Sequence, residues 1–273
     1  MTTPSGKEFN LKELTNKEYL ILLKFLNGEN FKGFYNTLNL LIQESIPEFE
    51  DLDICDKAYI YIAYYYYSVR SSISLKSNKF SNMEIPLTVL LDSLEEEYDK
   101  ENKKIKLLNW DCEIHYPKTL IFDSNDSIVI DFLSSLRKIK DINISLEECE
   151  KLRKEMPIKI LNELEYFVSK NFSAEIFIAK KSIGNEEVKE NLLSPAFFYS
   201  IAYIYKDMLE NFYNMQYMVT HYIRVDWTSL LNMTPAETSI LYKNFTEDKE
   251  NQNKKNKGIN LNDPNISDNL EIL

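Results

Sequence analysis

Apolar side chains recur at helical spacing from the start of the chain to Ser72. Thr15 and Glu18 form a capping box, in which each side chain bonds the backbone amide of the other residue and so starts a helix. A second amphipathic pattern covers residues 31–45, and a third begins at Asp53, a residue type that caps helices well. The pattern predicts three helices joined by short connections.

The periodicity changes in residues 81–125. Residues 84–89 contain β-branched side chains and a proline, as is typical of an edge strand or a strand start, and residues 90–98 suit a short helix. Alternating polar and apolar positions then indicate further strands over residues 105–108, 111–116 and 118–122. We expect a small α+β insertion in this part of the chain.

Helical patterns return in the second half of the chain. We expect one helix over residues 127–138 and another that starts at a capping box formed by Ser145 and Glu148. Pro157 interrupts or restarts this second helix, which then continues to Ser169.

A short hairpin is expected near residues 173–193. Residues 174–180 alternate between polar and apolar side chains, as a strand does. Residues 188–193 can pair with them across a turn that contains Gly184 and Asn185, two common turn residues.

The C-terminal block carries the strongest helix signals in the sequence. Ser194 is followed by Pro195, and proline is favoured at the first position of a helix. Apolar and aromatic side chains then predict one long helix over residues 196–222. Residues 224–226 end this pattern.

Two further helices are expected after this break. Asp226 can cap a short helix over residues 227–232. Residues 234–237 read Thr-Pro-Ala-Glu, which combines three helix-start signals, and the helix that follows is expected to run to Glu250. Residues 251–273 are rich in Asn and Lys and offer little to bury, so we expect a disordered tail.

These patterns predict a mostly α fold with a small α+β insertion. We expect a helical N-terminal unit, short strands in the middle and a C-terminal helical bundle. The expected units are residues 1–80, the insertion 81–125, the mainly helical unit 126–250 and the tail 251–273.

The charge balance narrows the class of partner. The chain has 273 residues and a formal net charge of -11, whereas proteins that bind duplex nucleic acid present a basic surface to the phosphates. Nucleic acid and anionic membranes are therefore not expected as partners. The most apolar run, residues 58–67, falls short of the ~20 residues that span a bilayer. We therefore expect no membrane insertion.

Candidate catalytic and metal-binding groups are sparse. The 3 cysteines lie far apart and form no CxxC pair. Cys112 and His115 would face opposite sides of a strand, which disfavours a shared metal. Asp51, Asp53 and Asp56 lack the following glycine and glutamate that a calcium loop requires. The sequence also contains no GxxxxGK[ST], GxSxG or HExxH motif, so we expect no enzyme activity, metal or cofactor.

Two aromatic groups are candidates for contact with another protein. Residues 64–67 are four consecutive tyrosines, which cannot share one helix face, so they either pack within the chain or reach a partner. The aromatic density of the C-terminal block exceeds what one helix stripe usually buries. We expect this block to bind a partner, although its helical spacing also fits a core. The residues concerned are Tyr205, Phe212, Tyr213, Asp226 and Trp227.

Several phrases of the sequence together carry a family resemblance. In the C-terminal block these are SPAFFY at 194–199, FYNMQY at 212–217 and DWTSLLNMTPAE at 226–237. Near the N-terminus they are LTNKEY at 14–19 and FEDLDICDK at 49–57. The chain thereby resembles the baseplate hub and hub-assembly family of T-even-like, contractile-tailed bacteriophages.

The resemblance implies a structural or assembly component of the baseplate hub that acts through protein–protein contacts. Its partners would be other phage tail and baseplate proteins, and its location the virion tail and, during assembly, the host cytoplasm. The family offers no catalytic residue to carry over. Two alternatives stay open, a tail-assembly chaperone that never enters the particle and an enzyme whose site is built from dispersed carboxylates. The oligomeric state is also open.

Overall fold

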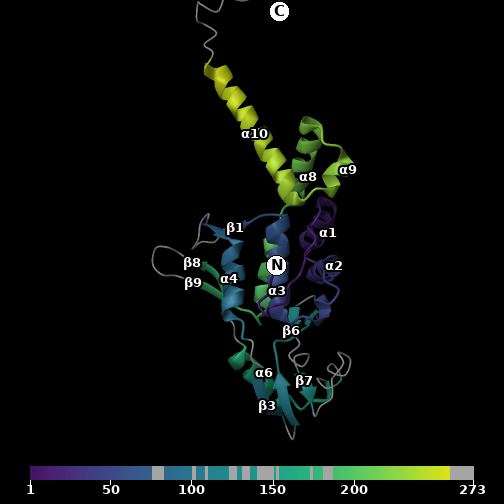
Figure 1. Ribbon diagram of the computed structural model, residues 1–273, viewed down its shortest axis with the longest axis vertical. Helices are drawn as coiled ribbons and strands as arrows, with labels where there is room; N and C mark the ends of the chain where they lie inside the picture. Colours follow the sequence, from purple (N-terminus) through teal and green to yellow (C-terminus); the bar gives the residue numbers. More distant parts are fainter. Residues whose placement is uncertain are drawn as a thin grey trace, which may run out of the picture.

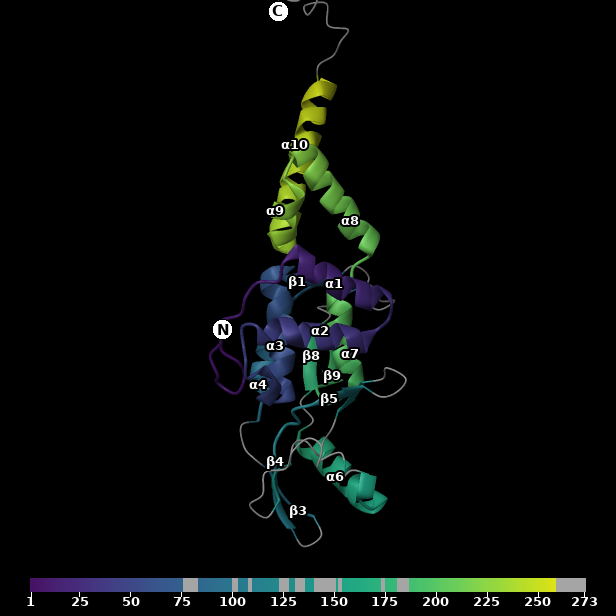
Figure 2. The same cartoon turned by 90° about the vertical axis from the view of Figure 1, so that its right-hand side faces the viewer.

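Four helices form the central body of the protein. They lie side by side near the middle of the long axis, as both orientations show (Figures 1 and 2). Their bounds are α1 Asn16–Asn27, α2 Phe31–Gln43, α3 Ile54–Ser68 and α7 Pro195–Tyr205. The computed structural model describes residues 1–75, 83–99, 103–107, 110–122, 128–130, 136–139, 151, 154–172, 175–180 and 187–258.

The predicted capping signals start the first and third helices. The Thr15 hydroxyl accepts from the Glu18 amide at 3.3 Å, and the Glu18 carboxylate accepts from the Thr15 amide at 2.8 Å. Asp53 accepts two backbone amides at the start of α3. The three N-terminal helices are therefore confirmed, although α3 ends at Ser68 because the chain becomes extended from Ser72 onward.

The body core joins helices that lie far apart in the sequence. The ring of Tyr35 in α2 contacts the rings of Tyr61 in α3 and Phe198 in α7. Within the tyrosine run 64–67 the first two rings are buried, whereas Tyr67 is exposed. Helices from the first and the last third of the chain therefore share one continuous core.

Short strands and two more helices flank the body. The hairpin of β8 and β9 lies beside α4 at the flank of the body, and the sheet β3-β4-β7 lies with α6 at one end of the molecule (Figure 1). All paired strands are antiparallel. The bounds are η1 Phe49–Asp51, β1 Ser72–Leu75, β2 Met83–Pro86, α4 Leu87–Glu97, β3 Lys103–Leu107, β4 Trp110–Ile114, β5 Leu120–Phe122, β6 Ile128–Ile130, β7 Leu136–Ile139, α6 Ile158–Asn171, β8 Glu175–Lys180 and β9 Glu187–Asn191.

The helix predicted over residues 127–138 is wrong in its described parts. Residues 128–130 are three consecutive β-branched side chains and form β6, which pairs with β5. Leu136–Ile139 form β7 and pair with β4. Strand pairing therefore overrides the helical spacing of the apolar positions in this segment.

Other predictions for the middle of the chain are confirmed, need a change of bounds, or lie outside the described residues. The hairpin of residues 174–180 and 188–193 is confirmed by β8 and β9, and α6 starts directly after Pro157. The expected strand 84–89 is shorter than predicted, because helix α4 already begins at Leu87. The turn residues Gly184 and Asn185, and the capping box of Ser145 and Glu148, lie outside the described residues.

The last four elements form an arm that stands on α1 at the opposite end from α6 (Figure 2). Helix α10 points away from the body (Figure 1). None of the described helices has the length and apolar character to cross a membrane. The bounds are α8 Leu209–Met218, the π-helical turn η3 Val219–Ile223, α9 Trp227–Asn232 and α10 Pro235–Gly258.

Two predictions for this region need correction. The single long helix over 196–222 is divided into α7 and α8. Helix α10 extends past Glu250 to Gly258, so the first part of the predicted tail is helical, and residues 259–273 lie outside the described part of the chain.

The fold class itself is confirmed. The protein is mostly helical, with short antiparallel strands in the middle and helices at the C-terminal end. The division into units at residues 80, 125 and 250 stays a prediction. The shared core shows that the body draws helices from the first unit and from the third.

Candidate functional site

The arm begins where α7 ends, and side chains of α1 hold this junction. The Tyr19 hydroxyl donates to the Tyr205 carbonyl at 2.9 Å. The side-chain amide of Asn27 donates to the Asp207 carbonyl at 3.0 Å. The Asp207 carboxylate accepts from the Met208 amide at 2.7 Å. Carbonyls at the end of a helix lack partners within it. Here α1 supplies such partners, which stabilises the end of α7.

The structure separates the five residues that the sequence grouped as a binding face. Tyr205 and Phe212 are buried. The Tyr205 ring packs edge-on against Phe34 and Tyr65, and its hydroxyl donates to the Tyr61 carbonyl. These two side chains therefore belong to the core, which leaves three of the five residues at the surface.

Tyr213, Asp226 and Trp227 are the accessible members of the group. The rings of Tyr213 and Trp227 are 42% and 49% exposed. Asp226 is exposed too, and its carboxylate accepts from the Ser229 amide at 3.0 Å as the N-cap of α9. The hydrogen bonds from Ser229 lower the pKa of Asp226. Asp226 thus sets the position of Trp227, the first residue of α9.

Further aromatic rings contact one another along α8 and η3 of the arm. Tyr217 and His221 stack with their ring centroids 5.2 Å apart and their planes 10° from parallel. The Tyr222 ring lies edge-on to His221 and also touches Phe245 of α10. Tyr217 and Tyr222 are 56% and 51% exposed.

Sequence reasoning missed these additional rings. Tyr217 and His221 are four residues apart, a spacing that places two side chains on one helix face and could have revealed the pair. The contact with Phe245 depends on the fold of α10 back along η3, which no local pattern shows. We define the arm surface as Tyr213, Tyr217, His221, Tyr222, Asp226 and Trp227.

The arm surface is nearly free of charge. Residues 208–233 contain Glu210, Arg224 and Asp226 as their only ionised side chains at neutral pH, with the histidine taken as neutral. The whole chain carries 75 charged residues, 32 basic and 43 acidic. Low charge combined with Tyr, Trp and Met is the composition found at the centre of protein–protein interfaces.

The aspartates near the start of α3 accept hydrogen bonds that hold other segments of the chain in place. Asp56 accepts from the amide and hydroxyl of Ser5 at 3.0 and 2.6 Å, and Asp53 accepts from the Tyr98 hydroxyl at 2.8 Å. Burial and the neighbouring Asp53 raise the pKa of Asp56. The N-terminal turn is thereby fixed to α3. Among the described residues no group of three His, Cys, Asp or Glu side chains could hold a metal ion.

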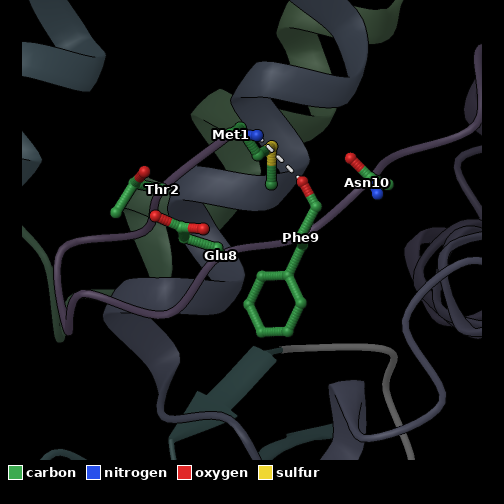
Figure 3. A pocket seen from close by; sticks show the side chains of 5 residues that line it. All are labelled: Met1, Thr2, Glu8, Phe9 and Asn10. Carbon is green, nitrogen blue, oxygen red and sulfur yellow. Dashed lines mark hydrogen bonds between the residues drawn. The ribbon is translucent and has the colours of Figure 1, made fainter.

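A hollow beside this N-terminal turn offers little chemistry. Met1, Thr2, Glu8, Phe9 and Asn10 line it (Figure 3). Glu8 is the one acidic side chain among them, and the Met1 ammonium donates to the Phe9 carbonyl at 2.8 Å. We therefore place the candidate functional site on the arm.

Comparisons with known proteins identify the family. Residues 1–192 match the model of the T4 bacteriophage base plate protein family. The arm follows this matched segment. No curated protein and no solved structure matches the chain. The match covers more than half of the 273 residues. The chain therefore belongs to the T4 bacteriophage base plate protein family.

Proposed function

We propose that the protein is a structural or assembly component of the baseplate hub of a contractile phage tail. Membership of the base plate family implies a location in the phage tail and other phage proteins as partners. The assignment to the hub rests on the resemblance of the phrases at 14–19, 49–57, 194–199, 212–217 and 226–237.

The arm surface is the feature that supports action through protein–protein contacts. Tyrosine and tryptophan combine a large apolar area with a polar tip, and they supply much of the binding energy at interfaces. Four such rings, those of Tyr213, Tyr217, Tyr222 and Trp227, are exposed on the arm, which stands at one end of the molecule (Figure 2). The proposed partner residues are Tyr213, Tyr217, Tyr222, Asp226 and Trp227.

A pull-down from infected cells tests this surface. The variant carries Tyr217→Ala and Trp227→Ala, and Tyr166→Ala serves as a matched control because Tyr166 of α6 is 69% exposed at the other end of the molecule. Loss of interface anchors costs about 2 kcal/mol or more, so capture of tail proteins should fall roughly 30-fold. Circular dichroism checks that both variants fold. Wild-type capture by the folded double variant would refute the proposed surface.

Mass spectrometry of purified particles separates the structural role from the assembly role. A structural component is present in mature virions at a fixed ratio to other tail proteins. A chaperone is present in assembly intermediates from the host cytoplasm and absent from mature particles. Absence from both would contradict the proposed function.

A further inference from the structure

A buried polar contact joins helices α9 and α10 to the body. Asn16, the first residue of α1, is fully buried where the arm meets the body. Its backbone amide donates to the Met233 carbonyl at 2.8 Å. Its side-chain amide donates to the Leu230 carbonyl at 2.8 Å and to the Thr238 hydroxyl at 2.6 Å. One asparagine therefore joins the end of α9 and the first turn of α10 to α1.

Two buried side chains, one in α8 and one at the start of α1, keep polar atoms without a hydrogen-bond partner. Gln216 of α8 is fully buried, and neither polar atom of its side chain has a hydrogen-bond partner in the described structure. The Asn16 Oδ1 atom likewise has none. A buried polar group without a partner costs free energy, whereas the same group in water does not. Closure of the junction thus carries a cost that opening would relieve.

Some apolar side chains of the arm belong to the body core, and others are buried outside it. The continuous core of the body includes Phe212 near the start of α8, where it packs edge-on against Tyr19. Val219 and Leu230 are buried as well but are not part of that core. The base of α8 is therefore anchored in the body core, whereas Asn16 supplies the side-chain hydrogen bonds that join α9 and α10 to α1.

A residue with a strained backbone conformation lies between these two parts. Arg224 has a left-handed backbone with a φ of 65°, directly after the π-helical turn η3. Such conformations are costly for residues other than glycine and often mark positions where a chain changes direction or moves. Arg224 therefore separates α8 and η3 from the segment that contains α9 and α10.

We propose that α9 and α10 form a lid that opens reversibly at the Asn16 contact and controls access to buried groups of α1 and α8 beside the arm surface. Opening would part Tyr222 from Phe245 and expose Gln216 and the start of α1 beside the rings of α8. A partner that binds these groups would select the open state. This regulation rests on the proposed function of the arm surface, but the opening itself is a property of the free protein.

Distance measurements on the purified chain test the lid. Spin labels are placed at exposed positions, Leu40→Cys on α2 and Ile240→Cys on α10, with the native cysteines replaced by serine. Asn16→Leu removes two hydrogen bonds of the closed state, so the open population should rise about fivefold or more. Lys17→Leu is the matched control, because Lys17 is the next residue of the same helix and its side chain is exposed.

Each result decides for or against the lid. A broader and longer distance distribution in Asn16→Leu alone supports it, and equal distributions in both variants overturn it. If Asn16→Leu does not fold, Thr238→Val, which removes one of the same bonds, should give a smaller shift in the same direction. Gln216→Leu should stabilise closure and slow amide exchange in residues 226–246.

The two proposals fail independently. The distances are measured without a partner, so an unchanged distribution rejects the lid and leaves the arm surface standing. Wild-type capture by the Tyr217→Ala, Trp227→Ala variant rejects the arm surface and leaves the lid standing.

Discussion

Phenol hydroxyls connect the helices of the body at the scale of single residues. Tyr19, Tyr35 and Tyr205 are buried, and each donates a hydrogen bond to a backbone carbonyl of a different helix. Burial raises the pKa of all three hydroxyls well above the usual range for tyrosine. These hydroxyls therefore stay protonated and act as donors across the working pH range. The tyrosines of this protein thus contribute both ring area and interhelical hydrogen bonds to the core.

Replacement of one such hydroxyl should give a measurable loss. The Tyr35 hydroxyl donates to the Phe198 carbonyl at 2.6 Å. Tyr35→Phe keeps the ring and removes this bond, so we expect the free energy of unfolding to fall by about 1 kcal/mol. Chemical denaturation followed by circular dichroism measures the change. Tyr67→Phe is the control and should be neutral because Tyr67 is exposed. An equal loss in both variants would contradict the bonding role.

At the scale of elements, helix starts follow local chemistry closely. Thr234 and Glu237 form a second capping box at the start of α10, with the Glu237 amide 3.1 Å from the Thr234 hydroxyl. Thr234→Ala removes this cap and should cost about 1 kcal/mol. Amide exchange in the first turns of α10 should accelerate roughly fivefold, since each 1.4 kcal/mol is a factor of 10. Thr246→Ala, within the same helix, should leave these rates unchanged.

Helix starts were therefore predictable, whereas the longer-range outcomes were not. Ser194, Asp226 and Thr234 all cap helices as their types predict. The end of α7 is stabilised by donors from α1, and the strand β7 depends on a partner strand, so neither could be found within one segment. The same limit applied to the candidate site. Spacing grouped five residues as one face, and only tertiary packing divides them into core and surface.

At the scale of the whole molecule, the protein consists of a body with a separate element at each end (Figures 1 and 2). The family match covers α1 to α4, α6 and the strands but ends before α7, so the arm belongs to the segment beyond residue 192. Yet α7 fills the body core, which ties the arm covalently to the centre of the fold. The exposed rings of the arm therefore lie outside the core that stabilises the body.

This arrangement predicts that the tip of the arm is uncoupled from global unfolding. Residues 247–252 of α10 are all exposed, so this part of the helix makes no buried contact. Proline inside a helix costs about 3 kcal/mol when the helix is part of the cooperative fold. Lys249→Pro should therefore leave the denaturation midpoint of the body unchanged, whereas Lys24→Pro in α1 should lower its stability by about that amount. Both lysines are exposed, so lost side-chain packing does not distinguish them. Near-UV circular dichroism in urea measures both. A comparable loss in Lys249→Pro would mean that the arm tip unfolds together with the body, because only a helix that shares the cooperative transition transmits the cost of proline to it.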